Sequence, residues 1–205
     1  MKYQGFAFLV CGAALAAGAA CESVLGSLEP SWFLATLEGD VNGEYTGTGS
    51  FSDDSRNPDA DIWIFSINSR GEGSSAGQSF HLYREGRDRP GIGTYSIVLR
   101  NISNPDVDGF NSFYTRTHTP EGSENDWYEM YAVQSGEVMI TASSKDRLEG
   151  TFHLTGFRYC AHENGTSNRI GPCRMPEEPI LDAPTIEVSG SFSVAPFDNS
   201  GVVAD

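Results

Sequence analysis

The sequence predicts an all-β fold, a single antiparallel β-sandwich or β-barrel of about eight to ten strands. Short segments in which apolar and polar residues alternate recur along the chain, as expected for half-buried strands. Clusters of Gly, Pro, Asn, Asp and Ser separate these segments. No continuous helical period of apolar residues follows residue 21, so alternating strands and helices are not expected. The pattern does not distinguish a sandwich from a barrel.

The expected strands, in chain order, are residues 33–39, 43–51, 61–68, 78–85, 93–100, 110–116, 127–133, 136–142, 150–156 and 185–194. The last is the clearest, because from Ile186 to Val194 every second residue is apolar or glycine and those between are serine or glutamate. Turn residues mark the connections at 40–43, 71–77, 87–91, 104–106, 120–122 and 134–136.

Residues 160–184 form the one long interruption of this pattern. Cys160 and Cys173 bound a polar loop that a Pro-rich segment follows. In an oxidising compartment these cysteines are expected to form a disulfide, which would stabilise the fold by roughly 3 kcal/mol in the chain-entropy treatment. A metal site with His162 as a third ligand lacks the usual ligand spacing.

Residues 1–20 have the layout of a secretory signal peptide. Lys2 gives a positive start, an apolar run begins at Phe6, and small residues end the segment. The apolar run is about 15 residues long, shorter than the about 20 that a membrane-spanning helix needs. We therefore expect export of a chain that comprises a tether (21–30), a β domain (31–196) and a C-terminal tail (197–205).

Cys21 follows small residues as the acylated cysteine of a bacterial lipobox does, although Gly18 stands where that motif usually has Leu. An ordinary signal peptidase could instead cut after Ala19. Removal of Cys11 with the signal peptide leaves three cysteines, so a Cys160–Cys173 pair would leave Cys21 unmatched. Lipidation of Cys21 is the preferred interpretation, and a free or intermolecular thiol is the alternative.

The net charge of −15 makes nucleic acid an unsuitable partner, because Lys and Arg supply most of the affinity for phosphate backbones. Anionic lipid headgroups would also repel such a domain. The membrane is therefore expected as a partner only through the lipid anchor, at the bacterial cell envelope, on the outer membrane or the periplasmic face.

Three segments carry a family resemblance: GTYSI (93–97), GEVMITASSKDRLEGTFHLTGF (136–157) and IEVSGSFSV (186–194). Together they resemble small uncharacterised bacterial lipoproteins with an all-β domain of unknown function. The resemblance covers roughly residues 91–196 and implies a lipid-anchored β domain, without catalytic residues to transfer. The segment from Cys160 to Pro184 is an insertion relative to that pattern.

Two motifs could carry chemistry. Ser75 lies in a G-x-S-x-G sequence, but a nucleophile elbow needs a helix after the serine, and residues 78–85 look like a strand. A hairpin turn is the preferred interpretation. Asn104, Asp106 and Asp108 precede Gly109 as in a calcium loop, but Thr115 stands where such a loop has its bidentate glutamate.

The histidines at 81, 118, 153 and 162 show no ligand spacing, and His81 and His153 are expected to be exposed. The aromatic residues of 127–131, with Trp32, suit either the core or a flat binding surface. We therefore expect a non-catalytic binding or structural protein at the envelope, without a cofactor. A lipocalin-like carrier of a small lipophilic ligand is the alternative, and a hydrolase using Ser75 and His153 is a third hypothesis.

Overall fold

A computed structural model describes residues 30–57, 62–86, 88–99, 109–119, 126–163 and 179–197. Nine strands and one short 3-10 turn form in these residues: β1 (Trp32–Gly39), β2 (Gly43–Asn57), β3 (Ile62–Gly71), η2 (Gly73–Ser75), β4 (Gln78–Glu85), β5 (Gly93–Ser96), β6 (Asn111–His118), β7 (Trp127–Ser143), β8 (Leu148–Glu163) and β9 (Thr185–Pro196). Within the described ranges, no helix has both the length and the apolar character needed to cross a membrane.

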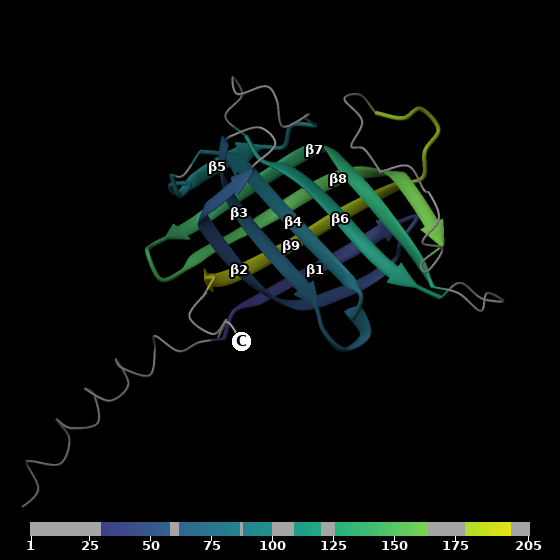
Figure 1. Cartoon of the computed structure of the whole chain (residues 1–205), viewed down its shortest axis with the longest axis horizontal. Coiled ribbons are helices and arrows are strands. Elements are labelled where there is room, and N and C mark those ends of the chain that lie inside the picture. The colour runs from purple at the N-terminus through teal and green to yellow at the C-terminus, as the bar shows by residue number, and fades with distance from the viewer. Residues whose placement is uncertain are drawn as a thin grey trace, which may run out of the picture. The chain divides into compact units, whose positions relative to one another are not determined.

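Eight of the strands close into an antiparallel barrel. The hydrogen-bonded order β7-β6-β4-β3-β2-β1-β9-β8 returns to its start because β7 also pairs with β8. Figure 1 shows this ring, in which β1 (purple) runs beside β9 (yellow). The short strand β5 lies outside the ring and pairs with the second half of β7. The all-β prediction is thus confirmed, and the continuous ring decides for a barrel over a sandwich.

The strand β7 corrects one expectation. Residues 134–136 were expected to turn the chain, but β7 runs through them from Trp127 to Ser143. A β-bulge between Val133 and Ser135 absorbs the irregularity. Gly136 follows with φ +129°, and a Cβ there would lie 2.1 Å from the carbonyl oxygen of His153 on β8. The glycine therefore lets two strands stay paired where its composition predicted a turn.

Aromatic side chains fill the barrel interior. Phe33 is 1% exposed, and its ring stacks on three others, with centroid separations of 5.5 Å to Phe80, 5.1 Å to Phe152 and 5.9 Å to Phe192. The alternation seen in the sequence is thus the alternation between this interior and the outer face. Large buried rings are the main source of the barrel's hydrophobic stabilisation.

Two glycines on β8 and β9 make room for these rings. Gly150 is directly opposite Phe192, and Gly190 is directly opposite Phe152. A Cβ on Gly150 would lie 2.7 Å from the Phe192 ring, and a Cβ on Gly190 would lie 2.4 Å from the Phe152 ring. Each phenylalanine therefore lies over the glycine of the neighbouring strand, so close that no larger residue fits opposite it.

A charged network lies at one end of the barrel, near the ends of β1, β6 and β8 and the start of β7. Glu129, whose side chain is 6% exposed, accepts hydrogen bonds from Arg116 Nε and from Arg158 Nη1, the latter at 2.8 Å. Asp40 accepts a 2.6 Å hydrogen bond from the Tyr131 hydroxyl and lies 3.3 Å from Arg158 Nη1. Two carboxylates thus balance two guanidinium groups, and these groups satisfy one another. We therefore assign the network a structural role at this end of the barrel.

Candidate functional site in an outer groove

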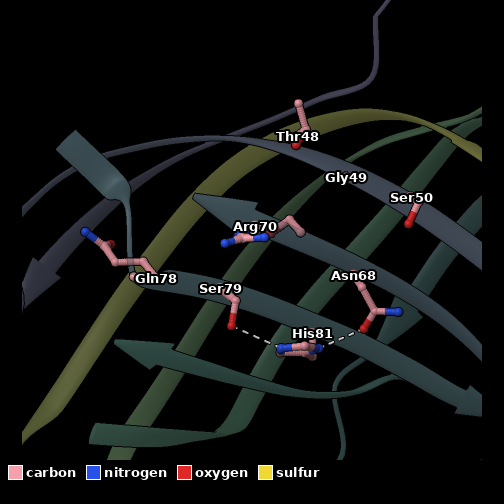
Figure 2. A pocket seen from close by; sticks show the side chains of 10 residues that line it. Thr48, Gly49, Ser50, Asn68, Arg70, Gln78, Ser79 and His81 are labelled. Atoms are coloured by element: carbon pink, nitrogen blue, oxygen red, sulfur yellow. Dashed lines mark hydrogen bonds between the residues drawn. The ribbon is translucent and has the colours of Figure 1, made fainter. Parts of the chain in front are cut away.

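A polar groove of about 590 Å³ crosses the outer face of β2, β3 and β4. Its volume lies in the range of small-molecule sites. Figure 2 shows the residues that line it: Thr48, Gly49, Ser50, Asn68, Ser69, Arg70, Gly77, Gln78, Ser79 and His81. Hydroxyl and amide groups predominate, with one guanidinium and one imidazole.

Strand register arranges the outward side chains of the groove and of the adjoining strand β6 in two rows. Residues directly opposite one another across β2, β3, β4 and β6 make the first row, Thr48, Arg70, Ser79 and Thr115, and the second row, Ser50, Asn68, His81 and Phe113. Opposite residues have Cβ atoms about 4.5–5.5 Å apart, close enough for their side chains to interact. The rows lie next to each other because Ser79 and His81 point to the same face of β4.

A directional hydrogen-bond relay links the two rows. The Asn68 amide nitrogen donates to Ser66 Oγ at 3.1 Å, so its oxygen is the atom 2.7 Å from His81 Nδ1. An oxygen of this kind only accepts, and Nδ1 must therefore carry the proton. In the neutral ring Nε2 is then the acceptor, and it lies 3.1 Å from Ser79 Oγ (Figure 2).

The relay continues from Ser79 to β6. Ser79 Oγ also lies 2.6 Å from Thr115 Oγ1. Because the Ser79 hydroxyl proton is directed to His81, Thr115 donates and Ser79 Oγ accepts. The relay therefore runs from Thr115 through Ser79, His81 and Asn68 to Ser66, and every donor in it has one acceptor. Thr115 and Ser66 are buried at 6% and 8% exposure, so both ends are anchored.

Burial keeps the His81 imidazole neutral. Loss of solvent contact lowers the pKa of His81 below its usual value. The side chains that face the ring are Asn68 from β3, Ser79 from β4 and Phe113 from β6, whose ring stacks on the imidazole at 4.3 Å. None of these neighbours is charged. His81 is half-buried, so the expectation that it is exposed is wrong: Asn68 and Phe113 on the neighbouring strands cover part of the ring.

Arg70 is the cation of the groove. Its side chain is exposed and stands directly opposite Ser79. It forms no ion pair with any residue that the structure describes, unlike Arg116 and Arg158 in the barrel end. A guanidinium without a protein partner offers five N–H donors to a bound oxygen-rich molecule.

Ser75 has a structural role, in agreement with the hairpin-turn interpretation. It is 0% exposed in η2, where its hydroxyl accepts from the Thr46 backbone N–H at 3.0 Å and donates to the Glu44 carbonyl at 3.3 Å. These bonds fasten the β3–β4 connection to β2. His153 instead pairs with Ser189 at 2.7 Å on β8 and β9 and is exposed, as expected. Ser75 and His153 thus have separate partners.

Most of the remaining predicted sites lie outside the described residues. The calcium candidates Asn104, Asp106 and Asp108, the cysteines Cys21 and Cys173, and residues 1–20 lie outside the described residues. Cys160 is 8% exposed near the end of β8 and is engaged in a disulfide. Its pairing with Cys173 stays a prediction. Among the described side chains, no three His, Cys, Asp or Glu residues gather as a metal site would require.

Sequence reasoning missed the groove as a site. The S-x-H spacing of Ser79 and His81, two residues apart in an expected strand, could have placed them on one face. Nothing in the sequence could have placed Asn68 beside them, because the connection between β3 and β4 is too long to set the register by its turn type.

No known protein family, curated protein or solved structure matches the chain.

Proposed function

We propose that this protein is a saccharide-binding β-barrel of the bacterial cell envelope, with the outer groove as its binding site. The observation that carries the proposal is the lining of the groove. Hydroxyls, amides and a guanidinium that has no ion-pair partner among the described residues line one concave surface, and together they can donate to and accept from the hydroxyl groups of a sugar.

The relay supports this proposal because its hydrogen bonds fix the conformations of the side chains that would bind the sugar. Side chains that are already hydrogen-bonded to each other lose little conformational freedom when a ligand binds. Asn68, Ser79 and His81 are fixed in this way, and the rigid strands β3 and β4 carry them.

The barrel fold is compatible with the alternative of a lipophilic carrier. Such a carrier holds its ligand inside the barrel, where small inward residues leave space. Phe33 and its neighbouring rings occupy the interior here, as do the paired tyrosines Tyr114 and Tyr131, whose centroids are 5.6 Å apart. These rings favour the outer groove over the interior as the ligand site.

Titration of the ¹⁵N-labelled β domain with N-acetylglucosamine and with maltose tests the proposal. Backbone amide shifts should change along β3 and β4 at the groove, and Asn68→Ala should weaken binding by about tenfold, the effect of losing one well-placed hydrogen bond. Asn42→Ala, which removes an amide from the β1–β2 turn outside the groove, should leave the affinity unchanged. Shifts confined to other faces, or none at millimolar sugar, would contradict the assignment.

Lipidation of Cys21 would hold the barrel at the membrane, and we propose that the protein binds its ligand there. The support is the signal-like segment 1–20 and the odd cysteine count. Wild-type protein expressed in a bacterium should enter the detergent phase and carry the mass of two or three acyl chains, whereas Cys21→Ser should stay aqueous and unmodified. A wild-type mature chain of unmodified mass in the aqueous phase would refute anchoring.

A further inference from the structure

We infer that the groove also hydrolyses acyl esters of its saccharide ligand, with Ser79 as nucleophile and His81 as general base. This inference rests on the proposed function, because it takes the same groove as the binding site. It adds a reaction, a substrate class (O-acylated sugars) and a role for each member of the relay.

The geometry of the relay is that of an activated nucleophile. Ser79 Oγ lies 3.1 Å from His81 Nε2, within the reach that proton transfer requires. His81 Nδ1 lies 2.7 Å from Asn68 Oδ1, so a third group orients the base. A nucleophile, a base and an orienting group in hydrogen-bond contact are the structural signature of covalent catalysis by serine. Asn68 acts through His81 and is a positioning residue.

The direction of the relay puts each proton where the reaction needs it. Because Asn68 can only accept at Oδ1, the free lone pair of the imidazole is on Nε2 and faces Ser79. Thr115 donates to Ser79 Oγ and so holds the nucleophile with its proton aimed at that lone pair. A scatter of polar side chains would not by itself fix both the tautomer and the hydroxyl direction.

The reaction has two steps. Ser79 Oγ forms a bond to the ester carbonyl carbon as its proton moves to His81 Nε2, and the sugar oxygen then leaves with that proton, so that an acyl-serine remains. Water next attacks the acyl carbon and gives its proton to Nε2, which returns it to Ser79 Oγ as the carboxylic acid departs. Ester and water are consumed, and acid and sugar alcohol are formed.

Arg70 provides the positive charge for the oxyanion. It is directly opposite Ser79 on β3, lines the same groove and forms no ion pair within the described residues. Negative charge develops on the carbonyl oxygen during both steps, and a cationic donor beside the nucleophile stabilises it.

A second Ser–His pair in the same barrel serves as a matched control. Ser189 and His153 are hydrogen-bonded at 2.7 Å on β8 and β9, but both are exposed and neither lines the groove. If any adjacent serine and histidine were enough, this pair would react as well as Ser79 and His81.

The test uses wild-type protein with a fluorophosphonate probe, p-nitrophenyl acetate and glucose pentaacetate. We expect one covalent label, located on Ser79 by peptide mass analysis, and release of acetate from both esters. Ser79→Ala should abolish the label and reduce kcat/KM by about 10³-fold or more, and His81→Gln by about 10²–10⁴-fold. Ser189→Ala should retain both label and rate.

Asn68 needs a readout beyond loss of rate. Asn68→Ala should lower the kcat for glucose pentaacetate by about 10²-fold in addition to the about tenfold weaker binding, whereas loss of a purely binding residue would leave kcat unchanged. Asn68→Asp should restore much of kcat. Circular dichroism melts of each variant establish that the barrel is folded.

Saccharide binding without labelling or acetate release would overturn this inference and leave the proposed function standing. Labelling at Ser189, or equal rates for wild type and Ser79→Ala, would overturn it as well. Failure to bind sugars and to turn over either ester would refute both proposals.

Discussion

Replacing Glu129 with glutamine isolates the contribution of the charged network at the end of the barrel to the stability of the fold. Glu129 is 6% exposed and faces Arg116 and Arg158, which are 20% and 29% exposed. Glutamine preserves the size of the side chain but removes its charge, so Arg116 loses its carboxylate partner and Arg158 keeps only Asp40. The whole change therefore falls on electrostatics and hydrogen bonding.

Removing one partner of a buried ion pair costs about 3–5 kcal/mol. The cost here should be smaller, about 2–3 kcal/mol, because both arginines keep some contact with water and Asp40 still neutralises Arg158. For a domain of this size that corresponds to a fall of about 4–12 °C in Tm.

The free energy of unfolding, measured by urea denaturation at pH 7 with circular dichroism, gives this number directly. Glu137→Gln is the matched control, because Glu137 stands on the same strand β7 but is exposed, and its change should remain within about 0.5 kcal/mol. If Glu129→Gln lowered the free energy of unfolding by less than about 0.5 kcal/mol, the structural role assigned to this network would be refuted.

Three further perturbations test other parts of the barrel. Burial alone would raise the pKa of Glu129, but the hydrogen bond and charge of Arg116 outweigh burial and lower it. Because the pKa is lower in the folded than in the unfolded protein, where it is about 4.3, the ionised carboxylate stabilises the fold above that pH. Wild type should therefore lose stability as the pH falls from 5 to 3, and a parallel pH curve for Glu129→Gln would contradict this. Phe33→Ala should lower the free energy of unfolding by about 3–5 kcal/mol, whereas Phe197→Ala, at a residue that is 57% exposed, should lower it by about 0.5 kcal/mol or less. Equal losses for the two variants in urea melts would contradict a filled core. Gly136→Ala should destabilise more than Gly43→Ala, by at least about 1 kcal/mol in urea melts, since both have positive φ but only Gly136 faces a backbone oxygen where the Cβ would lie. Equal losses would contradict that contact.

The outline of the fold follows from local pattern, whereas its closure does not. The alternation in residues 78–85 predicted β4 with the bounds that the structure has. Local pattern alone predicts two strands in place of the single strand β7, because Gly136 is a typical turn residue and only the contact of its backbone with β8 explains a glycine inside a strand. Whether strands form a sandwich or a barrel depends on the pairing of β7 with β8 as well as β6, which is set by long-range register and not by composition.

The candidate site was harder to predict for the same reason. Ser75 carries a recognisable motif and proves to be a turn residue, whereas Ser79 carries no motif and lies in the groove. The role of His81 depends on Asn68 and Thr115, which come from two other strands. Cross-strand neighbours of this kind are defined only once the strands are in register.

The tautomer of His81 tests the relay most directly. In ¹⁵N-histidine-labelled protein, long-range ¹⁵N–¹H correlation spectra distinguish a protonated from an unprotonated ring nitrogen, and His81→Gln identifies the signals of this residue. At pH 7 the directional relay requires a neutral ring with the proton on Nδ1 and a lone pair on Nε2 facing Ser79. A proton on Nε2, or a doubly protonated ring, would show that His81 does not accept from Ser79 and would contradict both the relay and the catalytic roles inferred for Ser79 and His81.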